Sequence, residues 1–189
     1  YTFGADETYT TSEGTFVRNQ GAQALDLQVM GSATVDGTFN LTRNSPTAFA
    51  TNGYAIAPAQ VMDSLRSYTV LLTTRPSSLD KQPRLYDFGH NSGNSLFLRA
   101  NTLAAGIKLS GGTTTMVSSG TALTAHNTYK IAVTFDARIH TTRIYINGQL
   151  VGSGTDNIYE PYMIAAGATC TRNYIGRTQW WDSNYASDN

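Results

Sequence analysis

Tyr129-Lys130-Ile131-Ala132-Val133-Thr134-Phe135 alternates large apolar or aromatic side chains with polar or small ones. Successive side chains of a β-strand point to opposite faces, so the four large residues of this stretch share one face. The other face carries Lys130, Ala132 and Thr134, which are smaller or more polar. The pattern predicts a β-strand with one face in a hydrophobic core and the other turned away from it.

The sequence that follows predicts a β-hairpin. Asn147-Gly148 stands between two strand-like runs, Thr142-Arg143-Ile144-Tyr145-Ile146 and Gln149-Leu150-Val151. Asn and Gly accept the positive φ angles that a two-residue type I′ turn requires. Short runs rich in β-branched and aromatic residues recur elsewhere, separated by Gly, Pro, Asn and Ser. They predict further strands at residues 67–75, 84–88, 95–99, 103–109 and 114–118, and one short helix at residues 59–66.

Length and composition predict a single domain over residues 1–189. A chain of 189 residues, 40% of them hydrophobic, can bury a core of its own. The sequence contains no internal repeat, charge run or low-complexity linker that would divide it. It begins at Tyr1 without a methionine or an apolar leader, so we expect a mature or excised piece of a longer protein. The regular short runs are typical of an antiparallel sandwich or barrel.

The charge balance argues against two kinds of partner. Thirteen Lys and Arg balance thirteen Asp and Glu, which leaves no basic excess to neutralise a phosphate backbone, and we expect no nucleic-acid partner. No segment approaches the roughly 20 apolar residues of a membrane span, so we expect no membrane insertion. Charged residues make up 14% of the chain, against a usual share of about 25%. The resulting surface of hydroxyl, amide and aromatic groups suits sugars and weak protein contacts.

Three stretches together carry a resemblance to a known family. They are residues 129–136, then Arg143-Ile144-Tyr145-Ile146-Asn147-Gly148, and later Asn173-Tyr174-Ile175-Gly176-Arg177. The chain resembles the laminin-G-like jelly-roll family, which is similar in fold to the concanavalin A-type lectins and glucanases. The resemblance covers nearly the whole chain and implies an all-β fold, an antiparallel two-sheet jelly-roll β-sandwich. It also implies an extracellular or cell-surface location.

The resemblance raises a question about the last strand of the sandwich. The family commonly continues with one more strand, whereas this sequence stops at Asn189. The sandwich is therefore expected to lack its own last strand, which would expose a sheet edge that native proteins normally cover. One hypothesis is that a neighbouring subunit or a cleaved remainder of the chain supplies the strand by strand addition. The alternative is that the polypeptide simply ends there.

The sequence disfavours an enzyme. Glycoside hydrolysis uses two carboxylates across the scissile bond, roughly 5 Å apart for retention and somewhat more for inversion. The only glutamates are Glu7, Glu13 and Glu160, and no Glu-x-Asp-x-x-Glu arrangement places two of them on one strand face. The motifs of serine hydrolases, phosphate-binding loops and zinc proteases do not occur either. We therefore predict a protein without catalytic residues, and a glycan-active enzyme is the disfavoured alternative.

Candidate ligand-binding residues gather near the end of the chain. Sugar recognition usually combines aromatic faces with side chains that hydrogen-bond hydroxyl groups. The segment 177–185 supplies both, and a second aromatic loop lies at residues 159–162. Two alternatives stay open, because one of two adjacent tryptophans on a strand would point into the core and tyrosines also line protein interfaces. The predicted ligand-binding residues are Arg177, Trp180, Trp181, Asn184 and Tyr185, with Tyr159 and Tyr162 in the second loop.

Calcium is the predicted cofactor. It accepts oxygen ligands from carboxylates and carbonyls in flexible loops, and related folds often carry it. The predicted ligands are Asp182 and Asp188, with Asp156 as a further candidate. None of them lies in a specific calcium motif, and such aspartates also stabilise turns through side-chain to backbone hydrogen bonds.

Two functions remain compatible with these observations. The first is a non-catalytic recognition module, carbohydrate-binding or adhesive, within a larger secreted or surface protein, with a glycan or an extracellular protein as its partner. The second is a structural subunit that assembles with its neighbours through strand exchange or edge pairing. The two differ in what the Trp180-Trp181 segment and the chain ends contact, which is a glycan in the first case and a polypeptide in the second.

Overall fold

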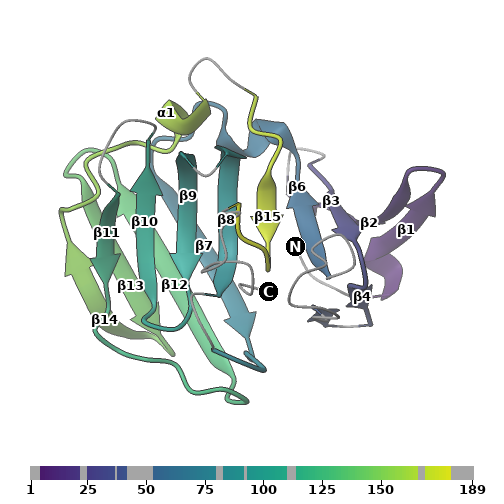
Figure 1. Cartoon of the computed structure of the whole chain (residues 1–189), viewed down its shortest axis with the longest axis horizontal. Coiled ribbons are helices and arrows are strands. Elements are labelled where there is room, and N and C mark those ends of the chain that lie inside the picture. Colours follow the sequence, from purple (N-terminus) through teal and green to yellow (C-terminus); the bar gives the residue numbers. More distant parts are fainter. Residues whose placement is uncertain are drawn as a thin grey trace.

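The computed structural model of the chain describes residues 5–21, 25–36, 38–41, 53–79, 83–91, 93–109, 114–165 and 169–179. Over these residues nearly all regular elements are β-strands, and every strand pair in the sheets is antiparallel. The predicted all-β antiparallel sandwich is therefore confirmed. Figure 1 shows its two layers, a larger sheet in front and a smaller sheet behind it.

The larger sheet has nine strands within the described ranges, in the order β1-β2-β3-β6-β15-β8-β9-β10-β11. The β1–β2 hairpin lies at one edge and projects away from the rest of the molecule (Figure 1). The strands are β1 (Thr8–Thr11), β2 (Gly14–Val17), β3 (Leu27–Met30), β6 (Tyr54–Ala57), β8 (Arg84–Asn91), β9 (Asn94–Arg99), β10 (Ala104–Lys108), β11 (Thr115–Ser118) and β15 (Asn173–Ile175).

The smaller sheet has four strands among the described residues, in the order β14-β13-β12-β7. They are β7 (Tyr68–Thr74), β12 (Tyr129–Asp136), β13 (Thr141–Ile146) and β14 (Gln149–Gly154). A separate two-stranded ribbon joins β4 (Thr34–Val35) and β5 (Phe39–Asn40). The short helical elements are η1 (Ala5–Glu7), η3 (Ala59–Met62) and α1 (Tyr162–Ala165).

The hydrophobic core lies between the two sheets. Alternate residues of β12 are buried while their neighbours are not, as the sequence pattern predicts, and the same alternation runs along β13. Each sheet contributes its inner face, because burying apolar side chains from both is what holds two layers together. Central core residues are Leu96, Leu98 and Ile107 from the larger sheet and Ile131, Val133, Phe135 and Ile144 from the smaller one.

The predicted hairpin is present, with β13 and β14 joined at Asn147-Gly148. Both turn residues have positive φ angles, 51° for Asn147 and 84° for Gly148, as a type I′ turn requires. The Asn147 side chain also accepts a hydrogen bond from the backbone N–H of Lys130 at 2.9 Å, which ties the turn to β12. The hairpin therefore forms for the local reason that the sequence indicated.

Replacing Gly148 with valine is expected to lower the free energy of unfolding by about 1 to 3 kcal/mol, because a β-branched residue resists positive φ. No atom lies within 4 Å of the position a Cβ would take, so the loss would come from backbone strain alone. Urea unfolding of Gly148→Val beside Gly148→Asn measures it, since asparagine tolerates this conformation and should lose less stability. Equal stability of the wild type and the valine variant would contradict the turn.

The predicted helix at residues 59–66 is shorter than expected. It is a single 3-10 turn, Ala59–Met62, which follows Pro58. Asp63 is already extended, with φ −66° and ψ 127°, and Ser64 has a φ of 59°. A right-handed helix cannot continue through these conformations, which explains where the element ends.

The last described strand, β15, lies inside the larger sheet. Ile175 pairs with Ala55 of β6 on one side and with Tyr86 of β8 on the other. At this place the sheet needs no strand from elsewhere. A strand supplied by another chain stays a prediction, and it would have to join one of the edge strands of the described sheets, which are β1, β11, β7 and β14.

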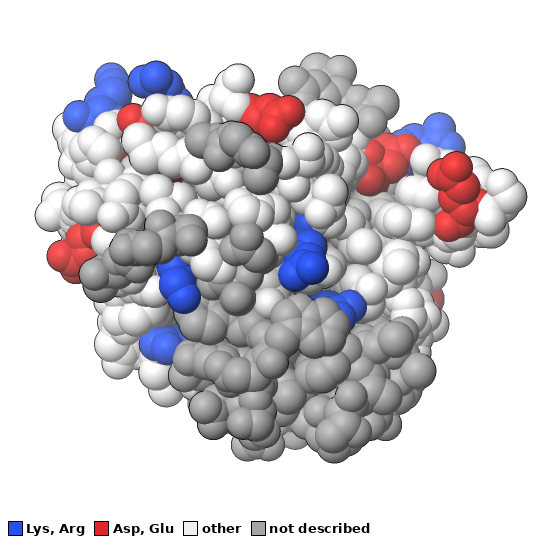
Figure 2. Space-filling view, turned by 45° about the horizontal axis from the view of Figure 1, so that its top comes forward, with Lys and Arg blue, Asp and Glu red and all other residues white. Residues whose placement is uncertain are grey.

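Charged side chains are spread thinly over the molecule. On the face that Figure 2 shows, Lys and Arg lie scattered among wide uncharged areas, and Asp and Glu lie between them. The described part of this face therefore carries no broad single-sign field of the kind that attracts nucleic acid. Among the described residues, no helix has both the length and the apolar content that crossing a bilayer requires.

Candidate functional site

The outer face of the smaller sheet, turned away from the core, is the most exposed strand surface with a regular pattern. The inner residues of β12 and β13 are buried, whereas their alternates are only partly covered. Leu71 on β7 is 76% exposed, and Leu150 on β14 is 55% exposed. We call this surface the outer face; the residues that the argument uses are Thr69, Leu71, Ala132, Thr134, Arg143, Tyr145 and Leu150.

Strand register sorts these residues into two rows. Thr134 pairs with Thr69 on one side and with Arg143 on the other, which makes a polar row across three strands. The neighbouring apolar row runs from Leu71 through Ala132 and Tyr145 to Leu150. Directly opposed side chains in a sheet have Cβ atoms about 5 Å apart, so members of each row are in contact range. The face thus combines hydroxyl and guanidinium groups with an aromatic ring and aliphatic carbon.

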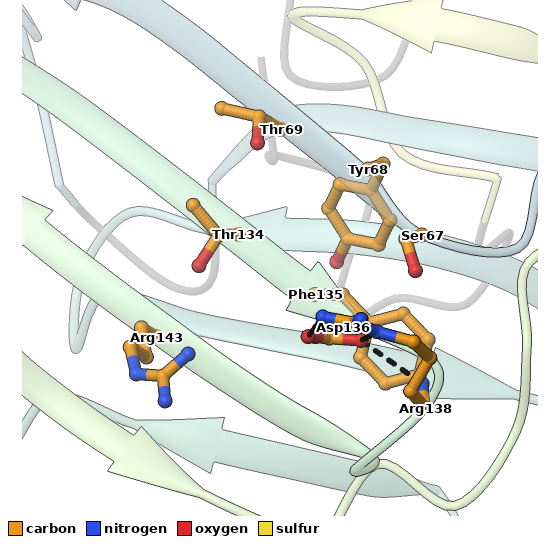
Figure 3. Close-up of a pocket in the computed structure, with 8 residues that line it drawn as sticks. All are labelled: Ser67, Tyr68, Thr69, Thr134, Phe135, Asp136, Arg138 and Arg143. Carbon is orange, nitrogen blue, oxygen red and sulfur yellow. Dashed lines mark hydrogen bonds and ion pairs between the residues drawn. The ribbon is translucent and has the colours of Figure 1, made fainter.

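A shallow depression of about 560 Å³ lies at the polar row. Figure 3 shows it with Arg143 on one side, Ser67 and Arg138 on the other, and Asp136 between them. Its lining contains three hydroxyl groups on short side chains, two guanidinium groups and one carboxylate. The lining residues are Ser67, Tyr68, Thr69, Thr134, Phe135, Asp136, Arg138 and Arg143.

Asp136 is held in its charged form at the end of β12. The Arg138 side chain donates to both carboxylate oxygens, Nε to Oδ1 at 3.3 Å and Nη2 to Oδ2 at 3.1 Å. The backbone N–H of Arg138 also donates to Oδ1, at 3.0 Å. These hydrogen bonds keep the pKa of Asp136 below its usual value, and those from the Arg138 side chain have the largest effect. The positive charge of Arg143 also lowers this pKa. The depression therefore contains a neutralised ion pair and a second guanidinium group.

Arg177, a predicted ligand-binding residue, lies on the opposite side of the sandwich. It follows β15 of the larger sheet, and its side chain is buried, with the residue 6% exposed. The guanidinium carbon lies 4.4 Å from the ring centroid of Tyr54 and 5.0 Å from that of Tyr174. Cation–π contacts of this kind stabilise the packing of a buried guanidinium. In this structure Arg177 packs the chain against the larger sheet.

A buried polar cluster holds the residues that follow Arg177. The carboxylate of Asp87 on β8 accepts hydrogen bonds from the backbone N–H of Gln179 at 3.1 Å and from its side-chain Nε2 at 3.0 Å. It also accepts one from the hydroxyl of Thr178 at 3.3 Å, and Arg84 forms an ion pair with it at 3.9 Å. Burial raises the pKa of Asp87 to about 6, against the opposing effects of Arg84 and the hydrogen bonds. The cluster fixes the segment that leads to Trp180.

The second predicted aromatic loop lies at one end of the sandwich. Tyr159 is half-buried and packs against the main core. Tyr162 begins α1, and the guanidinium of Arg66 lies 5.4 Å from its ring centroid and also pairs with Glu160 at 3.6 Å. Figure 1 shows α1 near the start of β15, whereas Arg177 follows its other end. Arg177 and the second aromatic loop therefore lie toward opposite ends of β15.

The remaining predicted site residues have two different outcomes. Asp156 is exposed in the loop after β14, and among the described ranges no group of three or more His, Cys, Asp or Glu side chains could hold a metal ion. Calcium binding stays a prediction, because two of its three predicted ligands, Asp182 and Asp188, lie outside the described ranges. The residues that lie outside the described ranges are Trp180, Trp181, Asp182, Asn184, Tyr185 and Asp188.

The outer-face residues were not predicted as a site. The alternation in residues 129–135 does place Thr134 on the non-core face, and Arg143 and Tyr145 alternate with core residues of β13 in the same way. This alternation was the sequence signal that pointed to an outer face on these two strands. It could not show that Thr69 lies beside them, because the pairing of β7 with β12 joins segments far apart in the sequence.

Comparison with solved structures shows the same fold. Domain 4 of an extracellular arabinanase from Geobacillus stearothermophilus, solved in complex with arabinotriose, has a TM-score of 0.52 at 15% identity, covering 82% of this chain and 75% of that one. The CBM40 of the Ruminococcus gnavus IT-sialidase, bound to α2,3 sialyllactose, has a TM-score of 0.51 at 17% identity, covering 64% and 68%. An alginate lyase of polysaccharide lyase family 7 covers 89% and 74% at 14% identity, but its TM-score of 0.40 carries no argument.

Identities this low show a shared fold and nothing finer. No curated protein matches the chain. A family model is decisive, because it matches residues 49–187 and therefore most of the sequence. With its two antiparallel sheets and this match, the chain belongs to the laminin-G-like family of the concanavalin A-like lectin/glucanases superfamily.

Proposed function

We propose that this protein is a non-catalytic carbohydrate-binding module of a larger secreted or cell-surface protein. Two of the similar solved structures, with TM-scores above 0.5, contain a bound sugar, which is arabinotriose in one and sialyllactose in the other. The observation that carries the proposal for this chain is the depression on the outer face, with its hydroxyl and guanidinium lining. We propose a glycan as the ligand and an extracellular location.

The chemistry of the outer face suits a sugar ring. Hydroxyl groups of a sugar both donate and accept hydrogen bonds, and Thr69, Thr134 and Arg143 offer matching groups in one row. Tyr145, in the adjacent apolar row, offers a half-exposed ring for the C–H groups of the sugar. Because the depression is shallow and exposed, part of a glycan chain can lie on it while the rest remains in solvent.

The carboxylate of the depression and the positions of the glutamates support a non-catalytic function. A general acid needs a pKa near the working pH, whereas the pKa of Asp136, the carboxylate of the depression, is lowered by Arg138. The glutamates lie on separate elements: Glu7 in η1, Glu13 between β1 and β2, and Glu160 before α1. No two of them flank a common site in the way that glycoside hydrolysis requires.

Replacing Thr134 with valine is expected to weaken glycan retention severalfold without unfolding the protein, because it removes one hydroxyl and keeps the shape and β-propensity of the side chain. A glycan screen of the wild type identifies the ligand, and calorimetry then compares the variants. Thr73→Val is the matched control, since Thr73 is exposed on β7 and pairs with Lys130, away from the depression. Equal loss in both variants, or a wild type that binds no glycan, would contradict the site.

The predicted ligand-binding segment at Trp180 and Trp181 remains a second proposal for the same function. The cluster around Asp87 holds Thr178 and Gln179 directly before it, so the start of this segment is fixed to the larger sheet. We also propose, on sequence grounds alone, that calcium binds Asp182, Asp188 and Asp156. Thr178 and Gln179, which precede Trp180, contact the larger sheet, whereas the depression lies on the smaller sheet, and variants of each site can be measured separately.

A second candidate function is assembly through edge pairing. The observation that favours it is on β7, an edge strand of the smaller sheet as described, which carries no charged residue and exposes Leu71. Edge strands of this kind are prone to pair with another chain. A monomeric mass in solution at high protein concentration would remove this candidate and leave the glycan-binding proposal unaffected.

A further inference from the structure

The depression on the outer face has an unbalanced positive charge. Its single carboxylate, Asp136, receives hydrogen bonds from both the side chain and the backbone of Arg138. The second guanidinium group, that of Arg143, acts on Asp136 through its charge, while the hydrogen bonds to this carboxylate come from Arg138. Two cations against one anion leave a net positive charge beside the hydroxyl groups.

Arg143 is placed to bind an anion together with a sugar ring. It lies at one end of the polar row, in register with Thr134, which is in register with Thr69. Neighbouring strands are about 4.8 Å apart, so the row spans about 10 Å, and an anion on Arg143 would bring the attached ring over the two threonine hydroxyls. A guanidinium group matches a carboxylate with two parallel hydrogen bonds, which fixes orientation as well as charge.

Few other groups on the outer face compete with a ligand for the guanidinium group of Arg143. Its neighbours in register are Thr134 and Ser153, and its strand neighbours on the outer face are Thr141 and Tyr145, all of them uncharged. The nearby carboxylate of Asp136 already accepts its hydrogen bonds from Arg138. Arg143 is partly exposed and lines the depression. Buried arginines such as Arg84 and Arg177, by contrast, are packed on aromatic rings of the larger sheet.

We propose that the depression recognises glycans that carry a carboxylate, with Arg143 binding the carboxylate and Thr134 and Thr69 binding ring hydroxyls. This rests on the proposed function and narrows its ligand class to acidic sugars. Tyr145 packs against the carbon face of the ring, and the Asp136–Arg138 pair closes the side of the depression next to Ser67. A neutral sugar would make the hydroxyl contacts and lack the charged one.

The test uses probe pairs that differ only in a carboxylate. Oligogalacturonate and its methyl ester form one pair, and sialyllactose and its methyl ester form another. For each pair that shows binding, we expect the acidic form to bind the full chain about tenfold or more tightly than the neutral form. A difference of this size is expected for a hydrogen bond to a charged group. The preference should shrink as salt increases, because this guanidinium is half-exposed.

Variants of Arg143 separate the inference from the proposed function. Arg143→Gln should remove the preference for the acidic form, Arg143→Lys should keep part of it, and Arg75→Gln, an exposed arginine at the far end of β7, should keep all of it. Equal binding of acidic and neutral forms, or a preference that survives Arg143→Gln, would overturn the inference while glycan binding stands. If no glycan binds, or if Thr134→Val and Tyr145→Ala leave the affinity for the glycan unchanged, the proposed function at this site is contradicted as well.

Discussion

Replacing Asp87 with alanine is expected to lower the free energy of unfolding by about 3 to 5 kcal/mol, the range for breaking a buried charged pair from one side. The carboxylate is fully buried, and its removal takes away an acceptor of the Thr178 hydroxyl, an acceptor of the backbone N–H of Gln179 and one of the two Asp87 oxygens that accept from the Gln179 side-chain amide. The charge of Arg84 would lose its buried counterion as well. Chemical denaturation at pH 7 measures the loss.

The matched control is Asp156→Ala, which removes an exposed carboxylate and should change stability by no more than about 0.5 kcal/mol. Asp87→Asn should fall between the two, because the amide keeps the shape and one acceptor. It also places a donor against other donors, although the Gln179 side-chain oxygen, buried without a hydrogen-bond partner, could accept from it after rotation. Wild-type stability in Asp87→Ala would contradict a structural role for the cluster.

Asp87 also predicts a pH dependence with a definite sign. Burial raises its pKa from 3.8 to about 6, so the folded state binds more protons than the unfolded state between about pH 4 and pH 6. Its contribution to the free energy of unfolding therefore falls as the pH rises through this window, by on the order of 3 kcal/mol at most, and is constant above it. Asp87→Asn has no proton to exchange, so wild type minus variant should decline from pH 4 to pH 6. A flat difference would argue against the raised pKa.

Phe135→Ala is expected to destabilise the protein by about 3 to 5 kcal/mol, because it removes a large core side chain and leaves a cavity. Phe135 is 2% exposed on the inner face of β12, and its ring centroid lies 5.9 Å from that of Tyr68 and 6.2 Å from that of His140. Phe135 and Tyr68 also line the depression, so this core position supports the proposed site. Thermal and urea unfolding give the size of the loss.

Leu71→Ala is the control for Phe135→Ala. Leu71 lies on the adjacent strand β7 of the same sheet but on the outer face, where it is 76% exposed. Its truncation should cost no more than about 0.5 kcal/mol, because little apolar area leaves the core. A loss for Leu71→Ala as large as that for Phe135→Ala would mean that the outer face is covered in solution, and would favour assembly over glycan binding.

Much of the smaller sheet could be predicted from the sequence because its signals are local. Alternation along residues 129–135 depends on the period of a strand, and the turn at Asn147-Gly148 depends on the φ angles of two residues. The helix at residues 59–66 was overestimated, since the extended Asp63 and the positive φ of Ser64 could not be seen in the composition. Local signals therefore predicted strands and turns better than they predicted where a short helix ends.

The candidate site could not be predicted in the same way. Thr69, Thr134 and Arg143 form one row only after β7 and β13 have paired with β12 in a particular register, and register is a property of strands that meet across the sheet. Arg177 was predicted to bind a ligand from its residue type and its neighbours in sequence. The structure buries it on Tyr54 and Tyr174, one of them on a strand far away in the chain.

The sequence by itself determined the all-β class, the core face of β12, the β13–β14 hairpin and the membership of a laminin-G-like sandwich. These follow from side-chain period, turn chemistry and family motifs, all of which are properties of contiguous residues. The tertiary structure alone decided the strand order, the position of β15 between β6 and β8, the burial of Asp87 beneath residues 178–179 and the alignment of Thr69, Thr134 and Arg143 in one row. Each of these depends on contacts between distant segments, whose free energy is gained only when the two sheets have packed together.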